Sequence, residues 1–97
     1  MGLKRIEEVV KGSNIIVHNT LVVKHFVYVT LDNVNVLIMK SKRKWSEPYV
    51  CLYSMSKDGK YAGRIDMPEI NFLPELRRLS SLTEKEVKDL IRKKREV

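Results

Sequence analysis

The sequence predicts an α+β domain with an antiparallel sheet of four to five strands, built of two hairpins, and with helices packed on one face. Three observations predict this class. The middle of the chain alternates apolar and polar residues, both flanks carry apolar residues at helical spacing, and Asp58-Gly59 is a strong hairpin signal. With 97 residues, 43% of them apolar, the chain is expected to form a single domain over 1–97.

A short N-terminal helix is expected within residues 1–12, followed by an antiparallel sheet that spans 14–67. Apolar residues recur at helical spacing near the start, and Gly12 is placed to end the helix. From 14 to 24 the chain is rich in β-branched residues, which favour one strand, kinked or broken near Asn19.

Segments 26–31 and 34–40 form the clearest predicted hairpin. Asp32-Asn33 is expected to be its two-residue turn, because both residues tolerate positive φ. Pairing Leu31 with Val34 places the aliphatic residues on one face: Val27, Val29, Leu31, Val34, Val36 and Ile38. The second face is mixed and carries Phe26, Tyr28, Thr30, Asn35, Leu37 and Met39.

Segments 49–56 and 60–67 form the second predicted hairpin, with Asp58-Gly59 in a type I′ turn. If Lys57 opposes Lys60, the aliphatic face continues through Val50, Leu52, Ile65 and Met67. The second face then carries Tyr49, Cys51, Tyr53, Met55, Ala62, Arg64 and Asp66. In this register Tyr53 lies directly opposite Arg64, within stacking distance.

Two helices are expected after the sheet. Segment 67–80 is predicted to be a helix that Pro74 kinks or restarts, with Asp66 as its N-cap and Glu69 completing a capping box. Segment 83–96 is predicted to be a basic C-terminal helix opened by a second capping box, Thr83 with Glu86. Its apolar stripe is thin and consists of Val87, Leu90 and Ile91.

The loop between the hairpins carries four positive charges in five residues and ends in an indole: Lys40-Ser41-Lys42-Arg43-Lys44-Trp45. Cations neutralise phosphates, and a flat ring stacks on a base. The whole chain has 19 Lys and Arg against 12 Asp and Glu, a net charge of +7. This excess favours a polyanionic partner, although the same charges could simply be solvated.

The predicted function is that of a small basic, non-catalytic protein that binds nucleic acid and prefers single-stranded DNA or RNA. Stacking is expected from Trp45, Tyr53 and Tyr28. Phosphate contacts are expected from Lys40, Lys42, Arg43, Lys44 and Arg64. The structural alternative is that the helices cover the aromatic face and make it the core.

Other readings of the same residues stay open. Leu37 and Met39 on the second face suit a homodimeric interaction or inhibitor module. The basic run that ends the last helix suits either a complement to the helix dipole or a second phosphate patch, which would make the protein a duplex DNA-binding regulator. That run consists of Arg92, Lys93, Lys94 and Arg95.

No catalytic residue, metal or cofactor is expected. His18 and His25 lie seven residues apart without a second cysteine or an acidic cluster nearby, and no Gly-rich phosphate loop or nucleophile elbow is present. Asp66 and Glu69 form one close carboxylate pair that helix capping explains. A small metal-dependent nuclease therefore stays open only as the last alternative.

The cellular setting follows from what the composition lacks. Cys51 is the single cysteine, so no intramolecular disulfide can form, and its place in a strand favours a buried thiol. The start of the chain has no long apolar run, so an intracellular, cytoplasmic protein without a membrane span is expected. The lack of glutamine, with many Lys, Glu, Val and Ile, is typical of thermophile proteins.

The segment Tyr49-Val-Cys-Leu-Tyr-Ser-Met-Ser-Lys-Asp-Gly-Lys-Tyr-Ala-Gly-Arg-Ile-Asp-Met-Pro, followed by a Leu-rich helix, resembles the positive cofactor four, PUR-alpha and Whirly class. Over about residues 26 to 80, the resemblance implies four antiparallel strands running into a helix, single-strand binding and dimers. It also implies that Lys57, Lys60 and Arg64 match the family's basic positions and Tyr53 its binding-face aromatic. The chain departs from the pattern at Pro74, in the elements before residue 26 and in the second C-terminal helix.

Overall fold

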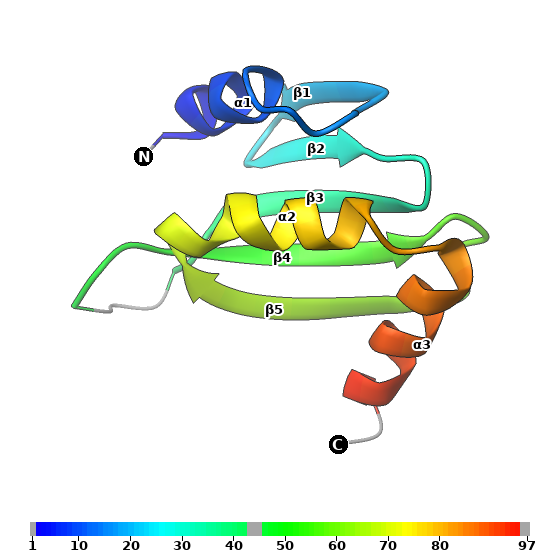
Figure 1. Cartoon of the computed structure of the whole chain (residues 1–97). Coiled ribbons are helices and arrows are strands. Elements are labelled where there is room, and N and C mark those ends of the chain that lie inside the picture. The colour runs from blue at the N-terminus through cyan, green and yellow to red at the C-terminus, as the bar shows by residue number, and fades with distance from the viewer. Residues whose placement is uncertain (1, 43–45, 96–97) are drawn as a thin grey trace.

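Residues 2–42 and 46–95, which the computed structural model describes with side chains up to Arg92, form a five-stranded sheet and three α-helices (Figure 1). The sheet is antiparallel in the order β1-β2-β3-β4-β5, so each strand pairs with its neighbours in sequence. The predicted α+β class is confirmed. The elements are α1 (Leu3–Lys11), β1 (Asn19–Val23), β2 (Phe26–Thr30), β3 (Val34–Lys40), β4 (Tyr49–Ser56), β5 (Ala62–Pro68), the 3-10 turn η1 (Glu69–Asn71), α2 (Phe72–Ser80) and α3 (Glu84–Arg95).

The aliphatic face is the core face of the sheet. Val29 pairs with Val36 and Val50 with Met67, as the predicted register of the two hairpins requires, and Ile38 pairs with Leu52 between the hairpins. The apolar stripes of the three helices pack on this face and complete one core. Figure 1 shows the ribbon of α2 crossing over the middle strands of the sheet. Their buried residues are Ile6 and Val10 of α1, Phe72, Leu76 and Leu79 of α2, and Val87 and Ile91 of α3.

The first strand is shorter than predicted, and it belongs to a hairpin that was not predicted from the sequence. The strand expected from residue 14 begins at Asn19, because the Ser13 hydroxyl bonds the Val10 carbonyl and the Ile15 amide and so folds the chain back after α1. β1 and β2 are joined by the two residues Lys24-His25. Lys24 has φ 54°, a conformation more often taken by Gly or Asn, so the turn carries no signal in the sequence.

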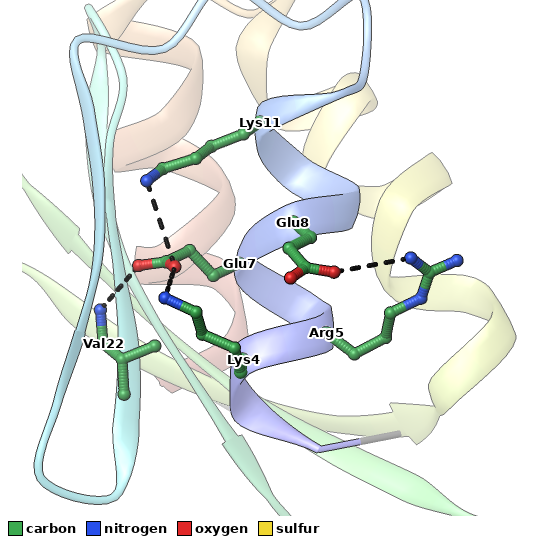
Figure 2. A network of polar contacts seen from close by, with 6 residues as sticks. All are labelled: Lys4, Arg5, Glu7, Glu8, Lys11 and Val22. Carbon is green, nitrogen blue, oxygen red and sulfur yellow. Dashed lines mark hydrogen bonds and ion pairs between the residues drawn. The ribbon is translucent and has the colours of Figure 1, made fainter.

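A buried carboxylate ties α1 to the edge of the sheet (Figure 2). Glu7 Oε2 accepts the backbone N–H of Val22 at 3.1 Å, while Oε1 faces Lys4 Nζ at 3.2 Å and Lys11 Nζ at 3.9 Å. The hydrogen bond from Lys4 is the largest cause that lowers the pKa of Glu7 below its ordinary value. Since β1 is an edge strand, this contact occupies a backbone donor that a further strand could otherwise pair with.

Both predicted turns occur at the expected positions but not with the expected geometry. Asp32 and Asn33 do not take positive φ; instead Asn33 Nδ2 donates to the carbonyls of Leu79 and Leu82, both at 2.6 Å, and satisfies the end of α2. In the second turn Gly59 alone has positive φ, 75°, and its N–H bonds Ser56 O, so the type I′ prediction was wrong.

The chain from β5 to α2 differs most from the prediction. β5 starts at Ala62 rather than residue 60 and continues to Pro68, so Asp66 lies in a strand and is not a helix N-cap. The helix expected from residue 67 begins at Phe72, after η1. Pro74 lies in its first turn, where a backbone N–H has no partner in the helix, and it therefore restarts the helix instead of kinking it.

The C-terminal helix is the element predicted best. Glu86 N donates to Thr83 Oγ1 at 3.1 Å and Thr83 N to Glu86 Oε1 at 3.0 Å, which is the predicted capping box. An ion pair of 2.8 Å between Lys88 and Asp58 joins the helix to the β4–β5 turn and lowers the pKa of Asp58 far below its ordinary range. No helix in the described part of the chain is both long and apolar enough to span a membrane.

Candidate nucleic-acid interface

The face opposite the aliphatic face has none of the described helices packed on it, and we call it the open face. Strand pairing places its side chains in rows that cross the sheet from edge to edge. One row reaches all five strands and consists of Leu21, Tyr28, Leu37, Tyr53 and Arg64. The adjacent row contains Met39, Cys51 and Asp66. The alternative in which helices cover the aromatic face was therefore wrong.

The open face is apolar for a solvent-exposed surface. Leu21 is 38% exposed, Val23 43% and Met55 44%, while Tyr28 and Tyr53 are half-buried by their neighbours on the sheet. Exposed apolar residues thus lie on two strands of the open face, β1 and β4. Both tyrosine rings are thus held in place and partly accessible.

A groove of about 210 Å³ lies where the open face meets the start of the basic loop, and we call it the Arg64 groove. It is lined by Met39, Lys40, Ser41, Lys42, Cys51, Tyr53 and Arg64. The fold thus brings four of the predicted site residues together: Lys40, Lys42, Tyr53 and Arg64. A second hollow of about 310 Å³ shares the segment from Met39 to Lys42 and is completed by Leu3 and His25.

Arg64 is oriented by two neighbours on the open face, Tyr53 in the groove and Asp66 on its own strand. Its guanidinium carbon lies 5.5 Å from the centre of the Tyr53 ring, and Nη1 donates to Tyr53 Oη at 3.1 Å. On the other side Nη2 donates to the Asp66 carboxylate at 3.4 and 3.5 Å. The predicted opposition of Tyr53 and Arg64 is confirmed, and the guanidinium stands over the ring that was expected to stack on a base.

Cys51 is buried at the centre of the open face, as predicted for a structural thiol, and forms no disulfide. Burial is the largest cause that raises its pKa to about 11, followed by a hydrogen bond with Asp66. The thiol therefore stays protonated at neutral pH. It contributes to the wall of the groove.

Several predicted site residues lie elsewhere or outside the described residues. Lys57 and Lys60 are at the opposite end of β4, which has eight residues and is about 23 Å long at about 3.3 Å per residue. Lys57 Nζ donates there to Asn35 Oδ1 at 2.9 Å. Arg92 belongs to α3, which packs on the aliphatic face, where Ile91 contacts Gly63. Arg43, Lys44 and Trp45 lie outside the described residues, as do the side chains of Lys93, Lys94 and Arg95.

The contacts of Asp66 on the open face were not predicted from the sequence. Alternation of the strand already places Asp66 on the open face, but the Asp66–Glu69 spacing favoured a helix cap instead. Among the described residues no group of three or more His, Cys, Asp or Glu side chains could hold a metal ion, and His18 contacts Asp32.

Comparison with known proteins gives no match to any protein-family model, any curated protein or any solved structure. The resemblance to the positive cofactor four, PUR-alpha and Whirly class therefore stays a prediction. Function has to be inferred from the residues that this chain places on its open face.

Proposed function

We propose that this protein binds single-stranded nucleic acid across its open face, with Lys40, Lys42 and Arg64 contacting phosphates and Tyr53 and Tyr28 contacting bases. The observation that carries this proposal is the Arg64 groove, in which three cationic residues and a tyrosine line a single hollow of about 210 Å³. Phosphate contacts supply affinity that falls with salt, and aromatic rings accept bases of any sequence.

The row across the sheet supports a single strand as the ligand. Tyr28 and Tyr53 lie in the same row with Leu37 between them, which separates them by two strand spacings, about 10 Å. Rings that lie on a sheet can reach bases only when those bases are unstacked and splayed out. A duplex keeps its bases inside, so it would offer these tyrosines only its backbone.

Overall charge favours a polyanion over a second copy of the chain. The exposed apolar residues Leu21, Val23 and Met55 support a homodimer through the open face as a second candidate. Such a dimer would bring together two chains of net charge +7, each with Arg64 on the shared face. Repulsion between like charges opposes this pairing, whereas a polyphosphate strand is attracted by the same residues.

The test is a titration of labelled oligothymidylate, of about 16 nucleotides, against the same length of duplex. We expect single-strand binding at low salt, with log K falling against log salt at a slope of about −2, which is about −0.7 for each of three phosphates. Absence of single-strand binding at about 0.05 M salt would end the proposal.

Matched variants place the interaction on the open face. The double variant Lys40→Ala/Lys42→Ala should weaken binding about tenfold and reduce the slope by about 1.4. The control, Lys57→Ala/Lys60→Ala, removes the same charge from the far end of the sheet. It should change the affinity and the salt slope less than Lys40→Ala/Lys42→Ala does. If both double variants weaken binding equally, attraction is general and the groove is not the site.

Tyr53→Leu separates stacking from charge. It should weaken single-strand binding by about 1–3 kcal/mol and leave the salt slope unchanged, since no cation is removed.

Light scattering of the wild type beside Leu37→Lys and Met39→Lys tests the dimer. A dimer that these variants dissociate, combined with no oligonucleotide binding, would favour the second candidate.

A further inference from the structure

We infer that Asp66 is a built-in competitor of the ligand phosphate for Arg64, so that this carboxylate sets the affinity of the Arg64 groove. The inference rests on the proposed function. It assigns to Asp66 a role in ligand selection that neither helix capping nor catalysis describes.

The geometry makes Asp66 the partner that a phosphate would have to replace. Arg64 and Asp66 are two residues apart on β5, so both side chains emerge on the open face. Arg64 Nη2 lies 3.4 Å from Asp66 Oδ1 and 3.5 Å from Oδ2, longer than an ordinary charged hydrogen bond. A ligand oxygen at a shorter distance can displace such a contact.

Asp66 is held firmly, whereas Arg64 can move. The Asp66 side chain is 18% exposed, and its carboxylate also takes part in a hydrogen bond with the buried Cys51 thiol. The Arg64 side chain is 49% exposed on a long, flexible stem. Exchange of partners at this pair therefore occurs by movement of the guanidinium towards the ligand, while the carboxylate stays in place.

The same exchange controls access to the aromatic ring. In the free protein Arg64 stands over Tyr53 and donates to its hydroxyl at 3.1 Å. A phosphate that draws the guanidinium away from Asp66 also draws it off the ring and exposes the ring to a base. A ligand that carries both a phosphate and a base binds Arg64 through the phosphate and Tyr53 through the base. Inorganic phosphate makes only the first of these contacts.

Asp66→Asn tests the inference, because the amide keeps the size of the side chain and removes its charge. We expect about threefold tighter binding of oligothymidylate at low salt, in the range of an exposed ion pair, and a salt slope close to that of the wild type, because Arg64 already contacts one of the three phosphates. Asp32→Asn is the matched control. It removes the same charge at the other end of β3, whose seven residues span about 20 Å, beyond the screening length.

A double-mutant cycle shows whether Asp66 acts through Arg64. Arg64→Gln should weaken binding, and in that background Asp66→Asn should give no gain, because the competed cation is absent. Circular dichroism and the urea midpoint verify folding, and Asp66→Ser replaces Asp66→Asn if the amide unfolds the chain.

The outcomes are distinguishable from failure of the proposed function. If the wild type binds no oligonucleotide, the proposed function fails first. If the wild type binds oligothymidylate but folded Asp66→Asn binds it equally or more weakly, the competitor role of Asp66 is overturned. The role is also overturned if Asp66→Asn raises the affinity by the same factor in the Arg64→Gln background. Tighter binding lost in the Arg64→Gln background, with Asp32→Asn unchanged, supports it.

Discussion

The two faces of the sheet are made by the same strands, yet one is covered by three helices and the other is open. On the aliphatic face Val29, Val36 and Leu52 are buried, and the helices bring matching apolar stripes. On the open face the same strands carry tyrosines, Arg64 and Asp66, whose polar atoms need water or a partner. Polar groups placed within an apolar row therefore oppose burial of this sheet face under a helix.

The largest expected effect comes from making one truncation on each face. Leu52→Ala removes a side chain that is 1% exposed in the core, and it should cost about 2–5 kcal/mol of unfolding free energy. Leu37→Ala, on the adjacent strand but on the open face, should cost less than about 1.5 kcal/mol, because little cavity forms at a half-exposed site. Urea denaturation measures both. Equal losses would mean that the open face is as tightly packed as the core.

A second pair of variants compares two asparagines. Asn33→Ala removes the donor to the carbonyls of Leu79 and Leu82 after α2, and losing these two hydrogen bonds at a buried site should cost about 1–3 kcal/mol. Asn35→Ala, on the open face, loses only an exposed contact with Lys57 and should cost within about 0.5 kcal/mol. Urea midpoints measure the stability of both variants. A smaller loss of stability in Asn33→Ala than in Asn35→Ala would contradict the role of Asn33 as a cap of α2.

Strand register was predictable from the sequence because alternation leaves little freedom. A one-residue slip would move Val27, Val29 and Val36 to the solvent face, so the pairing of both hairpins follows from their aliphatic residues. The Thr83–Glu86 capping box was predictable for a similar reason, since both partners are three residues apart and need no distant contact. Local rules therefore predicted most of the sheet and the last helix.

The candidate site was predictable only in part, because it depends on contacts between distant segments. Strand alternation placed Tyr53, Arg64 and Asp66 on one face, but it could not predict that Arg64 contacts both of the other two. The local capping pattern instead suggested that Asp66 is a helix N-cap. The Lys24-His25 turn was missed since neither residue is typical of positive φ. The separation of Lys57 and Lys60 from the basic loop follows from the length of β4 and is not visible as a motif.

The two faces also differ in how pH should affect stability. Glu7, which anchors α1 on the covered side, has a folded pKa below its unfolded value, chiefly because Lys4 donates to it. The unfolded chain therefore binds this proton first as pH falls, and the stabilisation present above about pH 4.3 is lost below it. Glu7→Gln should flatten the acid limb of stability against pH, measured by urea midpoints. Glu8→Gln, in an exposed pair with Arg5 at 3.6 Å, is the control and should leave that limb nearly unchanged.

Cys51 on the open face should act at the opposite end of the pH range. Burial, with a hydrogen bond to Asp66, raises its folded pKa from 9.0 to about 11. As pH rises past 9.0 the unfolded thiol loses its proton while the folded one keeps it, so stability falls until about pH 11. Cys51→Ala cannot ionise and should lose this alkaline decline, while Asp66→Asn should reduce it by removing one of its causes. If stability falls equally in the wild type and in Cys51→Ala as pH rises from 9.0 to about 11, a group other than the buried Cys51 thiol causes the decline.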